Sequence, residues 1–191
     1  MTCADGSFSV FSLEPFLLVH GIFFVYLLVQ GKVFPDYEEN KLGVAAKLVC
    51  KALAVSTGSD SSEIIGEWKK IGDLGEVAEK LVSKKSQKTL FSKSLSVKNV
   101  FDNLQKLSSL EGYGTVDKKL KLIAELLTSA SPLEAKYIVR TVLEDMRVGL
   151  GEGTLRDAIV WAFFKEDIDL KYDEKSNKIE VNREKFNEYS S

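Results

Sequence analysis

The 191-residue sequence predicts an all-α fold with one short β-hairpin near the C-terminus. Small polar residues that cap helices repeatedly stand just before an apolar run, most of them three positions before an acid or amide. Within these runs the apolar residues recur every three or four positions, as in Leu155, Ile159 and Phe163. Residues 168–181 instead alternate apolar and polar around Ser176 and Asn177, which predicts a hairpin.

The first apolar stretch, residues 16–29, could be a membrane segment or a buried helix. It is 14 residues long, and extending it backward brings in Ser12, Glu14 and Pro15. A signal peptide would carry basic residues at its start, and this sequence has no Lys or Arg before Lys32. We therefore expect a buried helix over about residues 22–30 and no membrane partner.

The helices of the middle region are predicted by their first residues. Ser131 precedes Pro132 at the first helical position and Glu134 three residues on, so we expect Glu134 to serve as a cap. Thr154, with Asp157 three residues on, predicts the same arrangement. The other expected caps are Asp60 with Glu63, Asp73 with Glu76, Ser96 with Asn99, and Thr115; the expected connections are 56–61, 83–95 and 108–115.

Charge is distributed unevenly along the chain, although the net charge is only -2. Residues 69–121 contain twelve lysines and six acids, whereas the rest of the chain is acidic. A lysine-rich solvated face and a surface for a polyanion both fit this pattern. Cys3, Cys50 and His20 form neither a disulfide framework nor a zinc motif, so we expect a reducing compartment, cytoplasmic or nuclear, and no metal site.

Three glycines, Gly149, Gly151 and Gly153, stand directly before the apolar run at 155–163. A helix start presents unpaired N–H groups to anions, and glycine lets a phosphate approach the backbone. The alternative is a glycine-rich turn that ends the preceding helix. These residues alone leave both interpretations open.

Four stretches together resemble a known family: "GKVFPDYEENKLGVAAKLVCKALA" (31–54), "IGDLGEVAEKL" (71–81), "EGYGTVDKKLKLIAELL" (111–127) and "SPLEAKYIVRTVLEDMRVGLGEGTLRDAIVWAFF" (131–164). They are similar to the N-terminal DNA-binding domain of ATP-dependent DNA ligases of the archaeal and eukaryotic replicative type. The resemblance covers about residues 22–164. It implies a compact multi-helix domain that clasps nicked double-stranded DNA for nick sealing in replication, repair and recombination.

The resemblance also implies which residues touch the DNA backbone and what lies outside this chain. ATP and Mg²⁺ would serve the parent ligase, whose adenylation and OB-fold domains would be the partners of this domain within one chain, while this segment would need no cofactor. The implied DNA-binding residues are Gly112, Gly114, Thr115, Lys118 and Lys119 in one loop and Arg147, Gly149, Gly151 and Gly153 in the other.

No catalytic residue is predicted in this chain. The Lys-x-Asp-Gly motif of the family's adenylated lysine does not occur, and the lookalike "KYDE" places Glu174 where glycine belongs, so we interpret Lys171 as a hairpin residue. We expect the chain alone to be inactive as a ligase. The alternatives are an enzyme in its own right and a helical protein-interaction domain that binds no nucleic acid.

The expected organisation has three parts. Residues 1–21 form an atypical apolar N-terminal segment where the family would have a polar, amphipathic opening, residues 22–164 form the helical DNA-binding domain, and residues 165–191 form a hairpin and linker toward a missing adenylation domain. Residues 182–189 resemble the opening of another helix. We therefore expect the chain to be part of a longer protein.

Overall fold

The computed structural model describes residues 23–84, 95–149, 151–176 and 178–190. Two compact units divide the chain, Met1–Arg147 and Val148–Ser191. The division falls before the last long helix, whereas the sequence placed a boundary after residue 164. The atypical segment at 1–21 lies outside the described residues.

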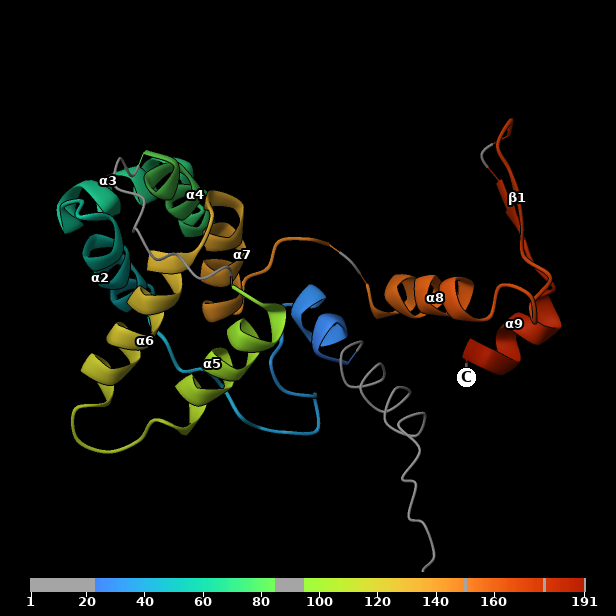
Figure 1. Cartoon of the computed structure of the whole chain (residues 1–191), viewed down its shortest axis with the longest axis horizontal. Coiled ribbons are helices and arrows are strands. Elements are labelled where there is room, and N and C mark those ends of the chain that lie inside the picture. Colours follow the sequence, from blue (N-terminus) through green and yellow to red (C-terminus); the bar gives the residue numbers. More distant parts are fainter. Residues whose placement is uncertain (1–22, 85–94, 150, 177, 191) are drawn as a thin grey trace, which may run out of the picture. The chain divides into compact units, whose positions relative to one another are not determined.

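The first unit consists of helices (Figure 1). A helix over residues 23–29 comes first. It is followed by α2 (Ala46–Thr57), α3 (Ser61–Ile71), α4 (Leu74–Lys84), α5 (Val97–Ser109), α6 (Thr115–Ser129) and α7 (Pro132–Val142). The prediction of an all-α domain is confirmed. The connections predicted at 56–61 and 108–115 lie between α2 and α3 and between α5 and α6, and overlap the helix ends by one or two residues. Most of the connection predicted at 83–95 lies outside the described residues.

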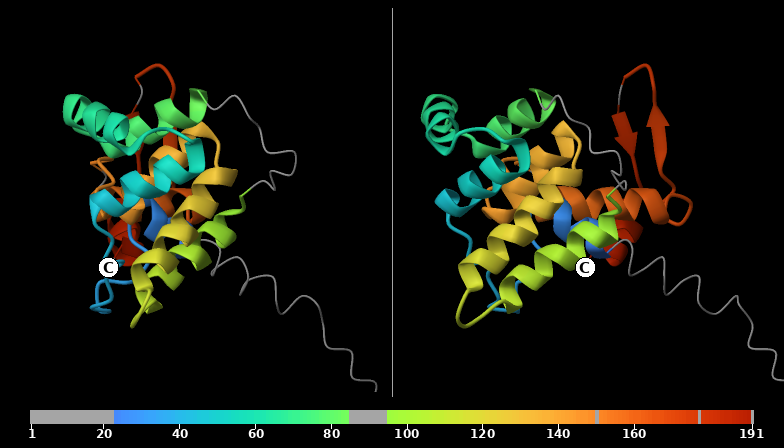
Figure 2. Two further views of the ribbon diagram at one scale, coloured as in Figure 1. Left: turned by 90° about the vertical axis from the view of Figure 1, so that its left-hand side faces the viewer. Right: turned by 60° about the vertical axis from the view of Figure 1, so that its left-hand side comes forward.

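One apolar core holds the first unit together. Helix α4 packs chiefly on α7, and α2 packs on α6, as both views of Figure 2 show. Leu53, Val77 and Leu127 are among the fully buried side chains at these contacts. Burial of each such side chain stabilises the fold by about 1.5–3 kcal/mol before the entropy of ordering it is subtracted.

The N-terminal helix is attached to this core by one face. Leu27 is buried, and the ring of Phe24 lies 4.6 Å from that of Phe101 between centroids. Phe23 and Val25 are exposed, so the expected burial of this segment holds for one face only. No helix in the described ranges has the length and apolar character needed to cross a membrane.

Most of the predicted helix starts are confirmed. Asp60 and Ser96 accept backbone hydrogen bonds as N-caps of α3 and α5, and Asp73 accepts one from the Gly75 N–H at the start of α4. Ser131 and Glu134 form a reciprocal capping box at α7, with Pro132 in the first turn. These starts were predictable because a cap and its helix are neighbours in sequence.

Two predicted caps are wrong. Helix α6 is preceded by Gly114 as its N-cap, and Thr115 is already helical. Helix α8 (Glu152–Phe163) has Gly151 as its N-cap, so Thr154 lies within its first turn. Within the described structure Asp157 caps no helix start, and its carboxylate pairs with the neighbouring Arg156 at 3.0 Å. In both cases glycine, which needs no side chain to enter a helix, begins the element earlier than the threonine pattern suggested.

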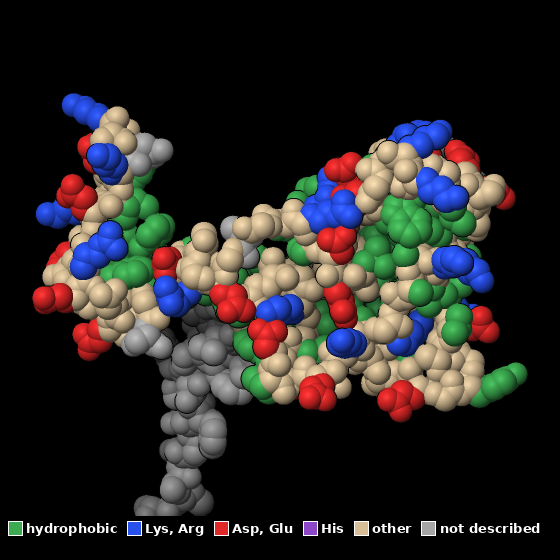
Figure 3. Space-filling model, turned by 180° about the vertical axis from the view of Figure 1, so that it is seen from behind, with side chains coloured by type: hydrophobic (Ala, Val, Ile, Leu, Met, Phe, Trp, Pro, Cys, Tyr) green, Lys and Arg blue, Asp and Glu red, His purple; other side chains and the backbone are tan. Residues whose placement is uncertain are grey.

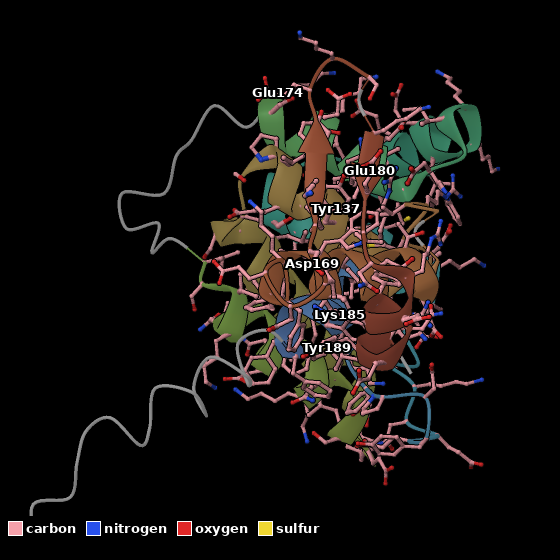
Figure 4. The ribbon with its side chains drawn as sticks, turned by 90° about the vertical axis from the view of Figure 1, so that its right-hand side faces the viewer. Tyr137, Asp169, Glu174, Glu180, Lys185 and Tyr189 are labelled. Atoms are coloured by element: carbon pink, nitrogen blue, oxygen red, sulfur yellow. The ribbon has the colours of Figure 1, made fainter. Side chains whose placement is uncertain are left out.

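The second unit contains α8, a two-stranded antiparallel hairpin of β1 (Lys171–Asp173) and β2 (Lys178–Glu180), and α9 (Arg183–Ser190). Its small core is Val160, Ile168 and Phe186. Lys185 of α9 donates to Asp169 before β1 at 3.1 Å, and Figure 4 shows the two residues close together. The predicted hairpin and terminal helix are confirmed.

Candidate nucleic-acid interface

The first predicted contact loop makes a tight glycine turn into α6. Gly112 and Gly114 have φ angles of 82° and 75°, a region that glycine occupies without strain. The Thr115 hydroxyl donates to the Gly112 carbonyl at 2.5 Å and fixes the turn. Tyr113, between the glycines, is fully exposed. No side chain caps α6, so its first N–H groups are open to an external acceptor.

Lys118 and Lys119, neighbours in sequence, have opposite environments. Lys118 is exposed on α6, and its side chain makes no hydrogen bond or ion pair within the described structure. Lys119 is 9% exposed, and its Nζ donates to the backbone carbonyl of Leu42 at 2.7 Å and more weakly to that of Gly43 at 3.5 Å. The ammonium of Lys119 is thus engaged inside the first unit.

Arg147 in the second loop is half exposed and held at several points. Its Nε donates to Asp145 at 2.8 Å, and its Nη2 donates to the Gly72 carbonyl at 3.0 Å. The bond to Asp145, opposed in part by desolvation, raises the pKa of Arg147 above its ordinary value. The guanidinium is therefore fixed in orientation and retains N–H groups for a further acceptor.

A buried ion pair lies behind Arg147. Asp73 is 5% exposed and accepts from Nη2 of Arg140 at 2.5 Å. Burial alone would raise the pKa of Asp73, but the bonds from Arg140 and from the Gly75 N–H outweigh it and lower the pKa below the usual value. This pair joins the start of α4 to α7 and positions the loop that carries Arg147.

The loop that carries Arg147 is also hydrogen-bonded to the chain at Leu42. Glu144 and Arg147 both adopt positive φ angles, 55° and 54°, which are uncommon for residues other than glycine. The Glu144 carboxylate accepts from the Leu42 N–H at 3.1 Å. Sequence reasoning missed both Leu42 and Glu144, because a contact between residues 102 positions apart leaves no local pattern.

The remaining predicted residues, Gly149, Gly151 and Gly153, belong to the second unit and are exposed. Gly149 has a φ of 65°, which explains a glycine there. Gly151 has an ordinary extended conformation, and Gly153 lies in the first turn of α8. The backbone of these two positions gives no conformational reason for glycine.

The space around each glycine separates two classes. A Cβ on Gly31 would lie 2.7 Å from Met146, and one on Gly75 would lie 2.9 Å from the Lys136 carbonyl, so these two glycines serve internal packing. A Cβ on any of the five glycines in the predicted contact loops would meet nothing within 4 Å. Internal packing therefore does not account for Gly151 and Gly153.

The lysine-rich middle region is partly neutralised by neighbouring acids. Lys80 pairs with Glu67, and Lys98 pairs with Asp102 at 2.7 Å. On the face that Figure 3 shows, basic and acidic side chains are interspersed. Surface pairs of this kind contribute little to stability. The excess of lysine in the sequence therefore does not by itself define a binding surface.

Two further predictions concern metal-ligating side chains and Lys171. They contain no group of three or more His, Cys, Asp and Glu side chains suited to a metal ion. Lys171 lies in β1 opposite Glu180 of β2 and is exposed. This placement confirms that Lys171 is a hairpin residue.

Comparison with known proteins identifies the family. Residues 18–160 match the family model described as DNA ligase N terminus. A DNA ligase of Thermococcus fumicolans is 49% identical over 136 residues, 71% of this chain and 24% of that protein, and one of Nanoarchaeum equitans is 47% identical over 137 residues, 72% of this chain and 24% of that protein. A DNA ligase of Methanosphaera stadtmanae is 43% identical over 150 residues, 78% of this chain and 27% of that protein.

The chain thus spans about a quarter of the length of these relatives. The matched region contains every described helix of the first unit and most of α8. The chain belongs to the family of DNA ligase N-terminal domains.

Proposed function

We propose that this chain is the DNA-binding module of an ATP-dependent DNA ligase and grips nicked duplex DNA through its backbone phosphates. The observation that carries the proposal is the family match over residues 18–160, together with relatives that are named DNA ligases. The module would act in the cytoplasm or nucleus during replication, repair and recombination. It would hold DNA for chemistry performed by other parts of the parent protein.

The two open helix starts support phosphate binding. At α6 and α8 the N-cap is a glycine, no side chain occupies the first N–H groups, and the surroundings of Gly114 and Gly151 are open. Backbone N–H groups and the helix dipole favour a phosphate at such a position. Contacts of this type position DNA without reading its bases, so binding would be independent of sequence.

The cations around these starts would have different tasks. Lys118 would contact a phosphate directly, since its ammonium is exposed and has no partner within the described structure. Arg147 would present its remaining N–H groups from a fixed position. Lys119, engaged with Leu42, would act on the loop rather than on DNA.

The nick-sealing chemistry would belong to the rest of the parent chain. This sequence lacks Lys-x-Asp-Gly, so the adenylation and OB-fold domains of the parent would use ATP and Mg²⁺. We expect no acid-stable adenylate when this chain is incubated with labelled ATP and magnesium. Formation of such an adenylate would instead make the chain an enzyme in its own right.

A second candidate function is a protein-interaction domain, favoured by one apolar groove. Leu28, Val97, Leu133 and Tyr137 line this groove of about 270 Å³ between the N-terminal helix, α5 and α7. Leu133 and Val97 are more than half exposed. If the chain were a protein-interaction domain of this kind, it would not bind nicked duplex DNA. Binding of nicked duplex therefore separates the two candidates.

A salt titration with a labelled nicked duplex tests the proposal. We expect the full chain to bind, with affinity falling steeply as salt rises and changing little when the duplex sequence is scrambled. Lys118→Met should reduce the slope of log affinity against log salt by about 0.9, the value for one phosphate contact. Lys121→Met, another exposed lysine of α6 (Thr115–Ser129), is the control and should leave the slope closer to that of the parent chain.

Two results would contradict the proposal. Absence of any complex at low salt would favour the protein-interaction domain. A complex whose salt slope is unchanged by Lys118→Met would move the DNA-contacting surface away from the α6 loop.

A further inference from the structure

The peptide segment at Leu42 connects the predicted contact loop before α6 to the segment that ends at Arg147, both within the first unit. Leu42 is 2% exposed, and both of its backbone polar groups are used by side chains from distant parts of the sequence. Its carbonyl accepts from Nζ of Lys119, one turn into α6, and its N–H donates to Glu144 in the loop before Arg147. We propose that Leu42 and these two side chains form a bridge between two loops, the α6 loop (residues 112–114) and the Arg147 loop (residues 143–147). The bridge would hold the two loops at the separation that the DNA backbone requires.

The geometry of this Lys119–Leu42–Glu144 bridge suits such a task. Lys119 lies at the buried face of α6 and cannot move outward without leaving the Leu42 carbonyl unpaired. Glu144 is exposed, yet its carboxylate is directed to a buried backbone N–H from a strained, positive-φ position. Strain of this kind persists only where surrounding contacts maintain it.

The bridge rests on the proposed function, because positioning two loops matters only if both loops hold DNA. A backbone phosphate repeat is fixed by the duplex, so two anchoring loops must keep a fixed separation to engage it together. Lys119 and Glu144 are therefore assigned as positioning residues, and neither is required to touch a phosphate.

A matched pair at Glu144 isolates the hydrogen bond from the charge. Glu144→Gln and Glu144→Ala both remove the negative charge and keep a side chain at the positive φ, but only glutamine retains an oxygen that can accept from Leu42. We expect Glu144→Ala to lower the affinity for nicked duplex about five- to tenfold relative to Glu144→Gln, at equal folded fraction by circular dichroism. The slopes of log affinity against log salt should be equal for the two variants, because both would make the same phosphate contacts once bound.

A second pair compares the two lysines. Lys119→Met should lower affinity while leaving the salt slope near that of the parent chain, whereas Lys118→Met should reduce that slope. The double variant Lys119→Met with Glu144→Ala should bind about as weakly as the weaker single variant, because breaking either end already releases Leu42. Hydrogen exchange at the Leu42 amide, faster in Glu144→Ala than in Glu144→Gln, reports whether the bridge has opened.

The possible outcomes distinguish this inference from the proposed function. If Lys118→Met reduces the slope but the Glu144 pair binds equally, the loops hold DNA and the bridge is only structural, which overturns the inference. Losses that multiply in the double variant overturn it as well. If neither the parent chain nor any variant binds DNA, the proposed function is wrong, and the inference that rests on it is wrong as well. If Lys119→Met does not fold, the Glu144 pair still decides.

Discussion

The starts of α6 and α7 lie in one domain and are built in opposite ways. At α7, Ser131 and Glu134 satisfy each other's backbone groups, and Pro132 removes one N–H altogether. At α6, Gly114 offers no side chain, and the first N–H groups have no side-chain cap. The difference shows that a closed helix start serves the fold, whereas an open start keeps donors available for an external group.

An open start is not sufficient to mark a contact site. Helix α2 also begins without a side-chain cap, at Ala45. Its N-cap residue carries a Cβ, and the nearest preceding glycine, Gly43, lies two residues earlier, where an added Cβ would be 3.4 Å from Nζ of Lys119. The combination of an open start, an unhindered glycine at the N-cap and an unpaired lysine distinguishes α6.

The largest expected effect is on stability, at the closed start of α4. Asp73→Ala should lower the free energy of unfolding by about 3–5 kcal/mol, because it leaves Arg140 buried without its partner. Urea denaturation measures the change. Asp73→Asn, which keeps an oxygen for the Gly75 N–H, should cost less. A loss near 1 kcal/mol in Asp73→Ala with none in Asp73→Asn would show that the cap, rather than the ion pair, stabilises this start.

The same carboxylate predicts a pH dependence. Because the folded state lowers the pKa of Asp73, its contribution to stability is complete above the unfolded pKa near 3.8 and is lost as pH falls through the folded value. The parent chain should therefore lose more stability below about pH 4 than Asp73→Asn does. Parallel acid unfolding curves for the two proteins would exclude this role for Asp73.

The next effect is on DNA binding at an open start. Gly151→Val leaves the charge unchanged and places a branched side chain where a phosphate would approach, so affinity for nicked duplex should fall about tenfold with the fold intact. Gly66→Val, at another glycine with no atom within 4 Å of the added Cβ, is the control and should bind normally. Equal binding by both variants would make Gly151 part of an ordinary turn.

A smaller effect is expected at the closed start of α7. Ser131→Ala or Glu134→Ala should lower the free energy of unfolding by about 1 kcal/mol, the typical value of a lost cap, and should hardly change DNA affinity. Thermal unfolding and a band-shift titration measure the two quantities. A tenfold loss of affinity with unchanged stability would place α7 among the contact elements and remove the difference between closed and open helix starts.

The smallest effect is expected at Asp157. Its carboxylate pairs only with the adjacent Arg156 in the described structure, and it caps no helix. Asp157→Ala should change the free energy of unfolding by less than about 0.5 kcal/mol, as for most surface substitutions. A loss near 1 kcal/mol would restore the capping role that the sequence pattern suggested.

The sequence by itself determined those features that depend on neighbouring residues. Local hydrogen bonds and local periodicity predict the cap of α7, the starts of α3, α4 and α5, and the hairpin around Ser176. The family could also be recognised from short stretches in order. Where the pattern failed, at Thr115 and Thr154, an adjacent glycine could begin the helix equally well.

The environment of each charged residue was decided by the tertiary structure. Val116 is apolar yet exposed on α6, while Lys119, four residues before buried Ile123, lies on the buried face. Adjacent residues on a helix point about 100° apart, so the rotation of α6 against α2 separates Lys118 from Lys119. The contacts of Asp73 with Arg140 and of Leu42 with Glu144 join residues 67 and 102 positions apart, and only packing brings such residues together.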